Sequence, residues 1–465
     1  MVFNEVMDRF VEQSPASVMF RGTLENVVTP KLLDEIFAKT ARRQHPSELL
    51  FSSIVDLLAM VATGSRKSVH EGYRAKKEQF TVSIKAVYAK LNGVETEVSR
   101  QMVRQTAERM REVVRRLAPR HPPLLRGYHT KIIDGNHLAA TEHRIKELRT
   151  IGSGPLPGLA LVVLEPDRML VSDVFPCEDG HAQERRILPQ VLPTVAPNDL
   201  WIADRNFCTT GYLFGIAKRG AAFLIRQHKQ TLHYELLGER RKIGRCPKGM
   251  IYEQKMRLLD DKGQAKEVRR VTIELKTPTR DGETEIHLLT NLPAKAANSR
   301  SIANLYLHRW TVEKAFHELD QAFYGEVKTL GYPGAALLSF CVALLAYNVF
   351  SVVKSAMAAV HGNEAKRETI SGYYLAGELA AAYHGMMIAV PPPEWKRRFA
   401  SLTSGELAST LKTLAAKIRP ERFRKNIRGP KKPPPKRSSA KHHPHVSTAR
   451  ILAQRKPDNM HKITA

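Results

Sequence analysis

Apolar residues recur at helical spacing in the first part of the chain and later gather into short runs. The stretch PSELLFSSIVDLLAMVA has the helical pattern, and SIKAVYAKL, Asn92-Gly93 and residues 94–117 are typical of helix, turn and helix. The segment HPPLLRG that follows is typical of a linker. We therefore expect a helical domain over residues 1–125.

From residue 126 onward, short apolar strands alternate with helical segments. The expected strands are KIID, which ends at Asp134, then LALVVLE, MLVSDVF, DLWIAD, which ends at Asp204, and AAFLIRQ. The expected helices are HAQERRILPQVLPTV and TTGYLFGIAKRG. Three strands, helix, strand, helix and strand is the order of a ribonuclease H-like α/β core, an analogy of fold alone. We place this domain at residues 126–360.

Polar and alternating residues interrupt this domain at about 228–284, where VRRVTIELKT and Asp281-Gly282 predict a mostly β insertion. The domain resumes with HLLTNLP and a helix from about Ser299 to Phe323. The run GAALLSFCVALLAYNVFSVV is long enough to span a bilayer. Because it contains polar residues such as Asn348 and stands alone, we expect a buried core helix, with a transmembrane span as the weaker alternative.

The C-terminal part changes character again. We expect a helical region over residues 361–421 and a disordered basic tail over residues 422–465. Between Arg422 and Lys462 the chain has 13 Lys or Arg residues and one acid, Asp458, which cannot bury a core. His442, His443 and His445 lie in this tract, and we expect them to add to it rather than to bind metal.

Charge then narrows the choice of partners. The chain of 465 residues is 43% hydrophobic, enough for a sizeable core, and 73 Lys and Arg against 46 Asp and Glu give a formal net charge of +27. This excess favours nucleic acid as the partner, and the alternative is a merely basic protein.

Four cysteines with no close spacing argue against a zinc site and a disulfide framework. The N-terminal residues lack the apolar stretch of a signal peptide, so we expect a cytoplasmic protein.

One predicted helix places basic residues on a common face. The spacings of four, seven and four align Arg100, Arg104, Arg111 and Arg115. This face suits contact with DNA phosphates. An ordinary solvated helix face is an equally good interpretation of these arginines.

Three carboxylates have the chemistry and placement that DNA phosphoryl transfer requires. Two divalent ions about 4 Å apart align the nucleophile and stabilise the leaving oxygen, and Mg²⁺ or Mn²⁺ prefers carboxylate oxygens. Asp134 and Asp204 end predicted strands, and Glu313 lies on the following helix. Either aspartate alone could merely cap a turn. The helix decides the interpretation, because Tyr306, Arg309, Glu313, His317 and Asp320 share one face while apolar residues occupy another.

These motifs resemble the DDE transposases of bacterial insertion sequences, specifically the insertion-sequence-4 group. The resemblance rests on IIDGN at Asp134, on ADRNF at Asp204, and on Tyr306, Arg309 and Glu313 at the spacing of the family's helix. It covers roughly residues 45–360, with the β insertion in the expected interval. It implies catalytic, metal-binding roles for the three carboxylates and DNA contacts for Tyr306 and Arg309.

The resemblance also implies a cut-and-paste reaction. The enzyme would bind two metal ions, and the reaction would pass through a hairpin intermediate. Its substrates would be the terminal inverted repeats and the target DNA. A homodimer would form the synaptic complex in the bacterial cytoplasm, associated with the nucleoid and not with a membrane. Alternatives are a catalytically decayed DNA-binding relic and a stand-alone metal-dependent nuclease, which shares the triad but lacks strand transfer.

Asp320 departs from the family pattern, which has Lys there. We expect His317 or Lys314 to substitute for that Lys. The family also holds a flipped base with an aromatic residue of the insertion, for which Tyr234 or Tyr252 would have to serve.

Other acidic residues compete less well for the carboxylate roles. They are Asp173, Glu318 and Glu326. For His181 and Glu184 we favour helix capping and surface roles over a place beside the site.

Overall fold

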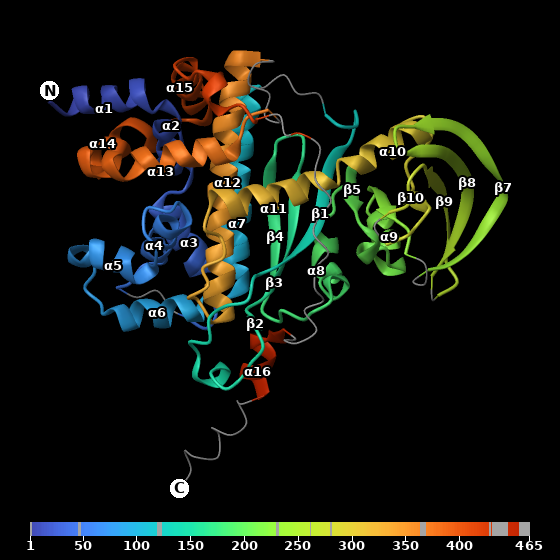
Figure 1. Ribbon diagram of the computed structural model, residues 1–465, viewed down its shortest axis with the longest axis horizontal. Coiled ribbons are helices and arrows are strands. Elements are labelled where there is room, and N and C mark those ends of the chain that lie inside the picture. Colours follow the sequence, from blue (N-terminus) through green and yellow to red (C-terminus); the bar gives the residue numbers. More distant parts are fainter. Residues whose placement is uncertain are drawn as a thin grey trace, which may run out of the picture.

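The protein is described by a computed structural model that covers residues 2–44, 48–118, 123–228, 232–260, 262–279, 281–362, 369–426, 429 and 445–454. Helices gather on one side of a central sheet, and a group of long strands extends from its other side (Figure 1). The molecule therefore combines α and β structure, as the sequence predicted.

Within the described residues, nine strands form one sheet in the order β4-β3-β1-β5-β6-β10-β9-β8-β7. Strands β1, β5 and β6 are parallel, and β3 and β4 are antiparallel to their neighbours. With the helices α8 and α9, these strands follow the order expected of a ribonuclease H-like core. The bounds are β1 (His129–His137), β3 (Leu159–Glu165), β4 (Leu170–Cys177), α8 (Leu188–Val191), β5 (Asp199–Ala203), α9 (Thr210–Lys218) and β6 (Ala222–Arg226).

Successive residues of the core strands face two different apolar layers. Ile132 and Ile202 belong to the cluster that includes helix α12 (Pro333–His361), whereas Ile133 and Trp201 belong to the cluster that includes α8 and α9. Side chains alternate along a strand, so a strand covered on both faces has a continuous apolar sequence. This accounts for β3, in which every residue is buried.

The predicted insertion consists of three long strands that extend the sheet. They are β7 (His233–Cys246), β8 (Gly249–Leu259) and β9 (Ala265–Leu275), and β10 (Glu285–Thr290) joins β9 to β6. Strand β7 forms the free edge and is exposed along most of its length. The insertion is therefore continuous with the core sheet.

Helices from both ends of the chain share one apolar core. Helix α7 (Thr96–Leu117) lies against β4 and α12, and α2 (Pro15–Val27) contacts α13 (Gly372–Ala389) and α15 (Ser404–Ala416). The predicted helical content of the N-terminal region is confirmed. Further helices are α1 (Val2–Gln13), α3 (Pro30–Thr40), α4 (Phe51–Ala62), α5 (Val69–Ala75), α6 (Ile84–Gly93) and α14 (Pro392–Trp395).

Helix α12 is long and apolar enough to cross a membrane, but its most apolar window is entirely buried inside the protein. Its polar residue Asn348 is satisfied by β4, because the amide accepts a hydrogen bond from Val171 N at 2.7 Å and donates one to Val171 O at 2.8 Å. Buried polar groups are tolerated when they are paired in this way. The prediction of a core helix is confirmed.

The segment from Ser299 to Phe323 forms two helices rather than the single helix that we expected. They are α10 (Ser299–Leu307) and α11 (Trp310–Ala322). Between them the backbone tightens, since His308 N donates to Leu305 O and Arg309 N donates to Tyr306 O, each at 3.0 Å. Tyr306 and Glu313 therefore lie on different helices, with Arg309 at the junction.

The expected helix over residues 181–195 is also broken. It consists of η3 (Glu184–Arg186), α8 and η4 (Leu192–Thr194). Pro189 and Pro193 account for this, because proline lacks the backbone donor and clashes with the preceding turn of a helix.

Part of the C-terminal segment that we expected to be disordered is folded. Strand β11 (Val446–Ser447) pairs with β2 (Pro155–Leu156), and α16 (Thr448–Gln454) follows. Arg450 Nε donates to Asp179 Oδ2 at 2.7 Å, and Ser447 and Thr448 are buried. The basic composition of the segment gave no indication that β11 and α16 fold against the rest of the protein. Residues 427–428, 430–444 and 455–465, which include His442 and His443, lie outside the described residues.

Candidate functional site

Asp134 and Asp204 lie on neighbouring parallel strands. The pairing of β1 with β5 ends at Ile132 and Ile202, so both aspartates lie two residues beyond the last paired position. The prediction that a strand ends at Asp134 is wrong, because β1 continues to His137 and Asp134 is paired with Val162 of β3. Asp204 directly follows β5 and accepts a hydrogen bond from Asn206 N at 2.7 Å.

Arg309 connects Asp134 to the third predicted carboxylate. Its Nη1 atom lies 3.2 Å from Asp134 Oδ2, and its Nη2 atom lies 2.6 Å from Glu313 Oε1. The side chains of Arg309 and Asp134 are 13% and 15% exposed, whereas that of Glu313 is 49% exposed. The first and third carboxylates are therefore brought together through the arginine of the same motif.

Tyr306 is buried at the end of α10 and faces the same group of charges. Burial raises the pKa of its hydroxyl to about 12, and the charges of Arg309, Asp204 and Asp134 also act on it. The side chain for which the resemblance implied DNA contact is therefore within electrostatic range of both aspartates and Arg309.

The site has an excess of negative charge. Burial is the main cause that raises the pKa of Asp134 to about 7; the charge of Arg309 opposes the rise, and the carboxylates of Asp204 and Glu184 add to it. Oxygen ligands of this kind fit a hard divalent cation. Among the described residues, however, no three His, Cys, Asp or Glu side chains are close enough to share an ion. Arg309 lies between Asp134 and Glu313, and the largely exposed Glu313 would have to exchange its ion pair to become a ligand.

Glu184 lies beside this site, contrary to the surface role that we favoured. Its Oε2 atom accepts a hydrogen bond from Asn206 Nδ2 at 3.2 Å, and burial followed by the charge of Asp204 keeps its pKa above the ordinary value despite that bond. A β-carbon added to Gly135 would overlap its carboxylate. The sequence signal that could have located it was its place after the third core strand, because the chain must return there toward β5.

A second set of residues near Asp204 was not anticipated. Glu283, at the end of the insertion, pairs with Arg226 and, at 3.3 Å, with Arg205, which directly follows Asp204. Trp310, beside Arg309, is 44% exposed. The insertion is thus tied to the turn that carries Asp204.

The four arginines that the spacing aligns on one face of α7 are not equivalent. Arg100 Nε and Nη2 each lie 3.1 Å from an oxygen of Asp173, and Arg104 Nε lies 3.4 Å from the same carboxylate. Arg111 Nη2 lies 2.7 Å from Glu165 Oε1. These pairs join α7 to the sheet. Arg115 is 60% exposed and pairs with Glu112.

The competing acidic residues have structural partners. Asp173 and Glu165 receive the α7 arginines, and Glu318 pairs with Lys354 of α12. Glu326 accepts hydrogen bonds from Ala139 N at 2.9 Å and Asn136 Nδ2 at 3.4 Å, near the end of β1. His317 and Asp320 are exposed on α11. Of these residues, none lies between Asp134 and Asp204.

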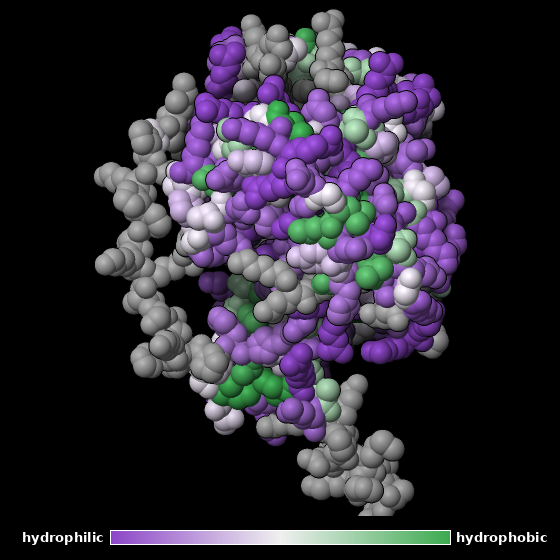
Figure 2. Space-filling model, turned by 90° about the vertical axis from the view of Figure 1, so that its right-hand side faces the viewer, coloured by the Kyte–Doolittle hydropathy of each residue, from purple (hydrophilic) through white to green (hydrophobic). Residues whose placement is uncertain are grey.

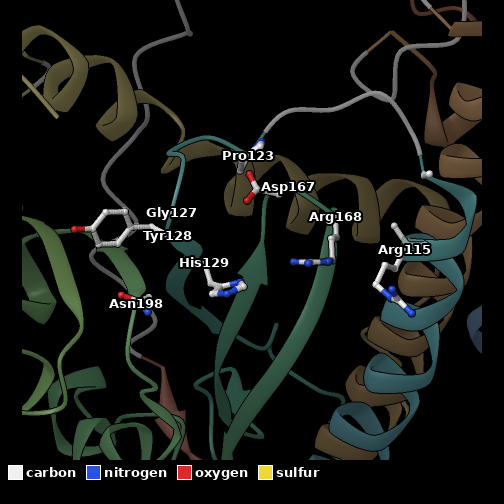
Figure 3. A pocket seen from close by; sticks show the side chains of 10 residues that line it. Arg115, Pro123, Gly127, Tyr128, His129, Asp167, Arg168 and Asn198 are labelled. Carbon is white, nitrogen blue, oxygen red and sulfur yellow. The ribbon is translucent and has the colours of Figure 1, made fainter. Parts of the chain in front are cut away.

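A pocket of about 480 Å³ lies at the beginning of β1 (Figure 3). Its lining includes His129, the first residue of β1, with Arg115 and Arg168. Asp134 and Asp204 are not among its lining residues, so the pocket is separate from the candidate site.

Comparison with protein families identifies the region that carries this site. Residues 130–349, somewhat less than half of the chain, match the family model of the transposase DDE domain. The match contains Asp134, Asp204 and Glu313. No curated protein matches the chain. The chain therefore carries a transposase DDE domain, which supports a DDE transposase from a family of metal-dependent DNA-cleaving enzymes.

Proposed function

We propose that the protein is a cut-and-paste DNA transposase of the insertion-sequence-4 group, with Asp134, Asp204 and Glu313 as catalytic metal ligands. The observation that carries this proposal is the link from Asp134 through Arg309 to Glu313, beside the strand end that carries Asp204, within a transposase DDE domain. Each motif is weak in the sequence alone, and the ion pairs that join the first motif to the third support one site.

Each residue of the site has a role that follows from its chemistry. Two Mg²⁺ or Mn²⁺ ions, when bound, would activate the attacking oxygen and stabilise the leaving oxygen. Asp134 and Asp204 would hold them from adjacent strands. Glu313 would join them after leaving Arg309, and the freed guanidinium would then bind a DNA phosphate in a fork geometry. Tyr306 would orient this arginine and contact the DNA backbone.

The DNA bound at the site would be the terminal inverted repeats of the element. The net charge of +27 favours a polyanion, and the face that carries the insertion is largely hydrophilic (Figure 2). We propose that this face and the N-terminal helices bind the repeats, with His317 and the exposed Arg115 as further contacts. Contacts through Arg100, Arg104 and Arg111 would require their ion pairs with the sheet to open.

One site could perform every step of the reaction. Nicking, hairpin formation, hairpin opening and strand transfer are all in-line displacements at phosphorus, so the same carboxylates and arginine serve each of them. Two protomers, one on each end, would form the synaptic complex in the bacterial cytoplasm.

The test is Asp134→Asn, which keeps the shape of the side chain and removes its charge. We expect DNA cleavage in Mg²⁺ or Mn²⁺ to be lost and duplex binding to be retained, while the exposed control Asp8→Asn cleaves normally. Cleavage that persists in the variant or in EDTA would refute the proposal. Cleavage by the unaltered protein without joining to target DNA would identify a nuclease. Binding without cleavage would identify the decayed relic that Asp320 suggests.

A further inference from the structure

Asp134 and Asp204 lie beyond the last residues at which their two strands pair directly with each other. The hydrogen-bonded pairing of β1 and β5 ends at Ile132 and Ile202. Beyond that point Asp134 continues alongside β3, and Asp204 enters the turn η5 (Arg205–Phe207). The direct ladder between β1 and β5 therefore leaves room for other contacts to adjust the spacing of these two carboxylates.

Glu184 occupies the space between these two segments. One carboxylate oxygen lies against Gly135, where a β-carbon would overlap it. The other accepts the hydrogen bond from Asn206, whose backbone N–H donates to Asp204 Oδ1 at 2.7 Å. A continuous series of contacts thus runs from Gly135 through Glu184 and Asn206 to Asp204.

The segment that carries Glu184 is itself held in place. His137 Nδ1 lies 3.2 Å from Gly180 O, and Ser447 Oγ accepts a hydrogen bond from Gly180 N at 3.1 Å. Ala182, two residues before Glu184, is buried in the layer with α8 and α9. Glu184 is therefore presented from an anchored loop rather than from a free surface turn.

We propose that Glu184 is a positioning residue of the reaction, which sets the distance between Asp134 and Asp204 by bridging Gly135 and Asn206. This inference rests on the proposed function. It assigns a reason to the glycine after Asp134: position 135 must lack a side chain so that the Glu184 carboxylate can enter. The backbone of Gly135 does not have a positive φ, so its small size matters rather than its conformational freedom.

The experiment combines Gly135→Ala with Glu184→Ala. In the unaltered background the added methyl displaces the carboxylate, and we expect kcat for cleavage to fall ~10- to 100-fold with an unchanged KM for DNA. In the Glu184→Ala background the space is vacant, so Gly135→Ala should cause little further loss. Gly152→Ala, where a β-carbon meets no atom, and the exposed Glu178→Gln are the matched controls.

Glu184→Gln separates positioning from charge. The amide oxygen can still accept the Asn206 hydrogen bond, so this variant should retain more activity than Glu184→Ala. Equal losses in the two variants, or additive losses for Gly135→Ala and Glu184→Ala, would overturn the proposal.

An activity-independent readout distinguishes this inference from the proposed function. The free energy of unfolding of the same four proteins should show the same non-additivity, because the overlap at Gly135 exists only when the Glu184 side chain is present. If the unaltered protein cleaves no DNA, the proposed function fails, and the unfolding measurements still decide whether Glu184 bridges the two segments.

Discussion

The contact between α7 and the sheet offers the sharpest test of what the arginines of this helix do. In Arg100→Ala, the Asp173 carboxylate, whose side chain is 9% exposed, loses a two-point partner. The guanidinium also leaves the ring of Phe175, which lies 4.1 Å from it. The change therefore affects both an ion pair and a cation–π contact.

The magnitude follows from the burial of this pair. Removing one partner of a buried ion pair costs about 3–5 kcal/mol, because the other charge is left unpaired. Arg104, at 3.4 Å from the same carboxylate, remains as a partial substitute. We therefore expect the free energy of unfolding to fall by about 2–3 kcal/mol.

Urea denaturation measures this difference, with the exposed Arg115→Ala, expected to leave stability unchanged, as the control. DNA binding is measured on the same proteins as a function of salt. A residue that contacts one phosphate changes the slope of log K against log salt by about 0.9. Unaltered stability in Arg100→Ala together with such a change in slope would refute the structural role and restore the DNA-binding interpretation.

Two further predictions concern charge near DNA. Removing residues 422–465 should flatten the salt dependence of duplex binding, because this segment holds 13 Lys and Arg residues. It should also lower the free energy of unfolding, because Arg450 and Ser447 no longer hold the loop at Asp179 and Gly180. An unchanged salt slope would mean that the segment does not touch DNA. Asp320→Lys, at an exposed position of α11, should tighten binding to element ends in a mobility-shift assay, because it replaces repulsion of phosphate by attraction; weaker binding together with weaker cleavage would show that Asp320 has a positive role.

The sequence was sufficient wherever local pattern decides structure. The succession of strands along the chain in the core followed from short apolar runs, and the insertion followed from alternation and turn residues, because both signals come from neighbouring positions. The core helix α12 followed from its composition, since an apolar helix with scattered polar residues must be buried against other elements.

Only the tertiary structure decided which partner each charged residue has. Periodicity placed Arg100 and Arg111 on a common face but could not show that Asp173 and Glu165 lie opposite them. It treated Ser299 to Phe323 as one helix, whereas the turn at Arg309 directs that side chain toward both Asp134 and Glu313. Contacts between residues far apart in the chain leave no periodic signal, since neither partner's position constrains its own neighbours in sequence.

The same division holds at the candidate site. The sequence determined the candidate carboxylates, because their chemistry and the strands and helices that carry them can be recognised locally. It did not reveal Glu184, since its contact with Gly135 depends on a loop that His137 of β1 and Ser447 of the docked C-terminal segment hold at Gly180. The spacing of Asp134 and Asp204 is likewise a tertiary property, because the strands that carry them cease to pair two residues earlier.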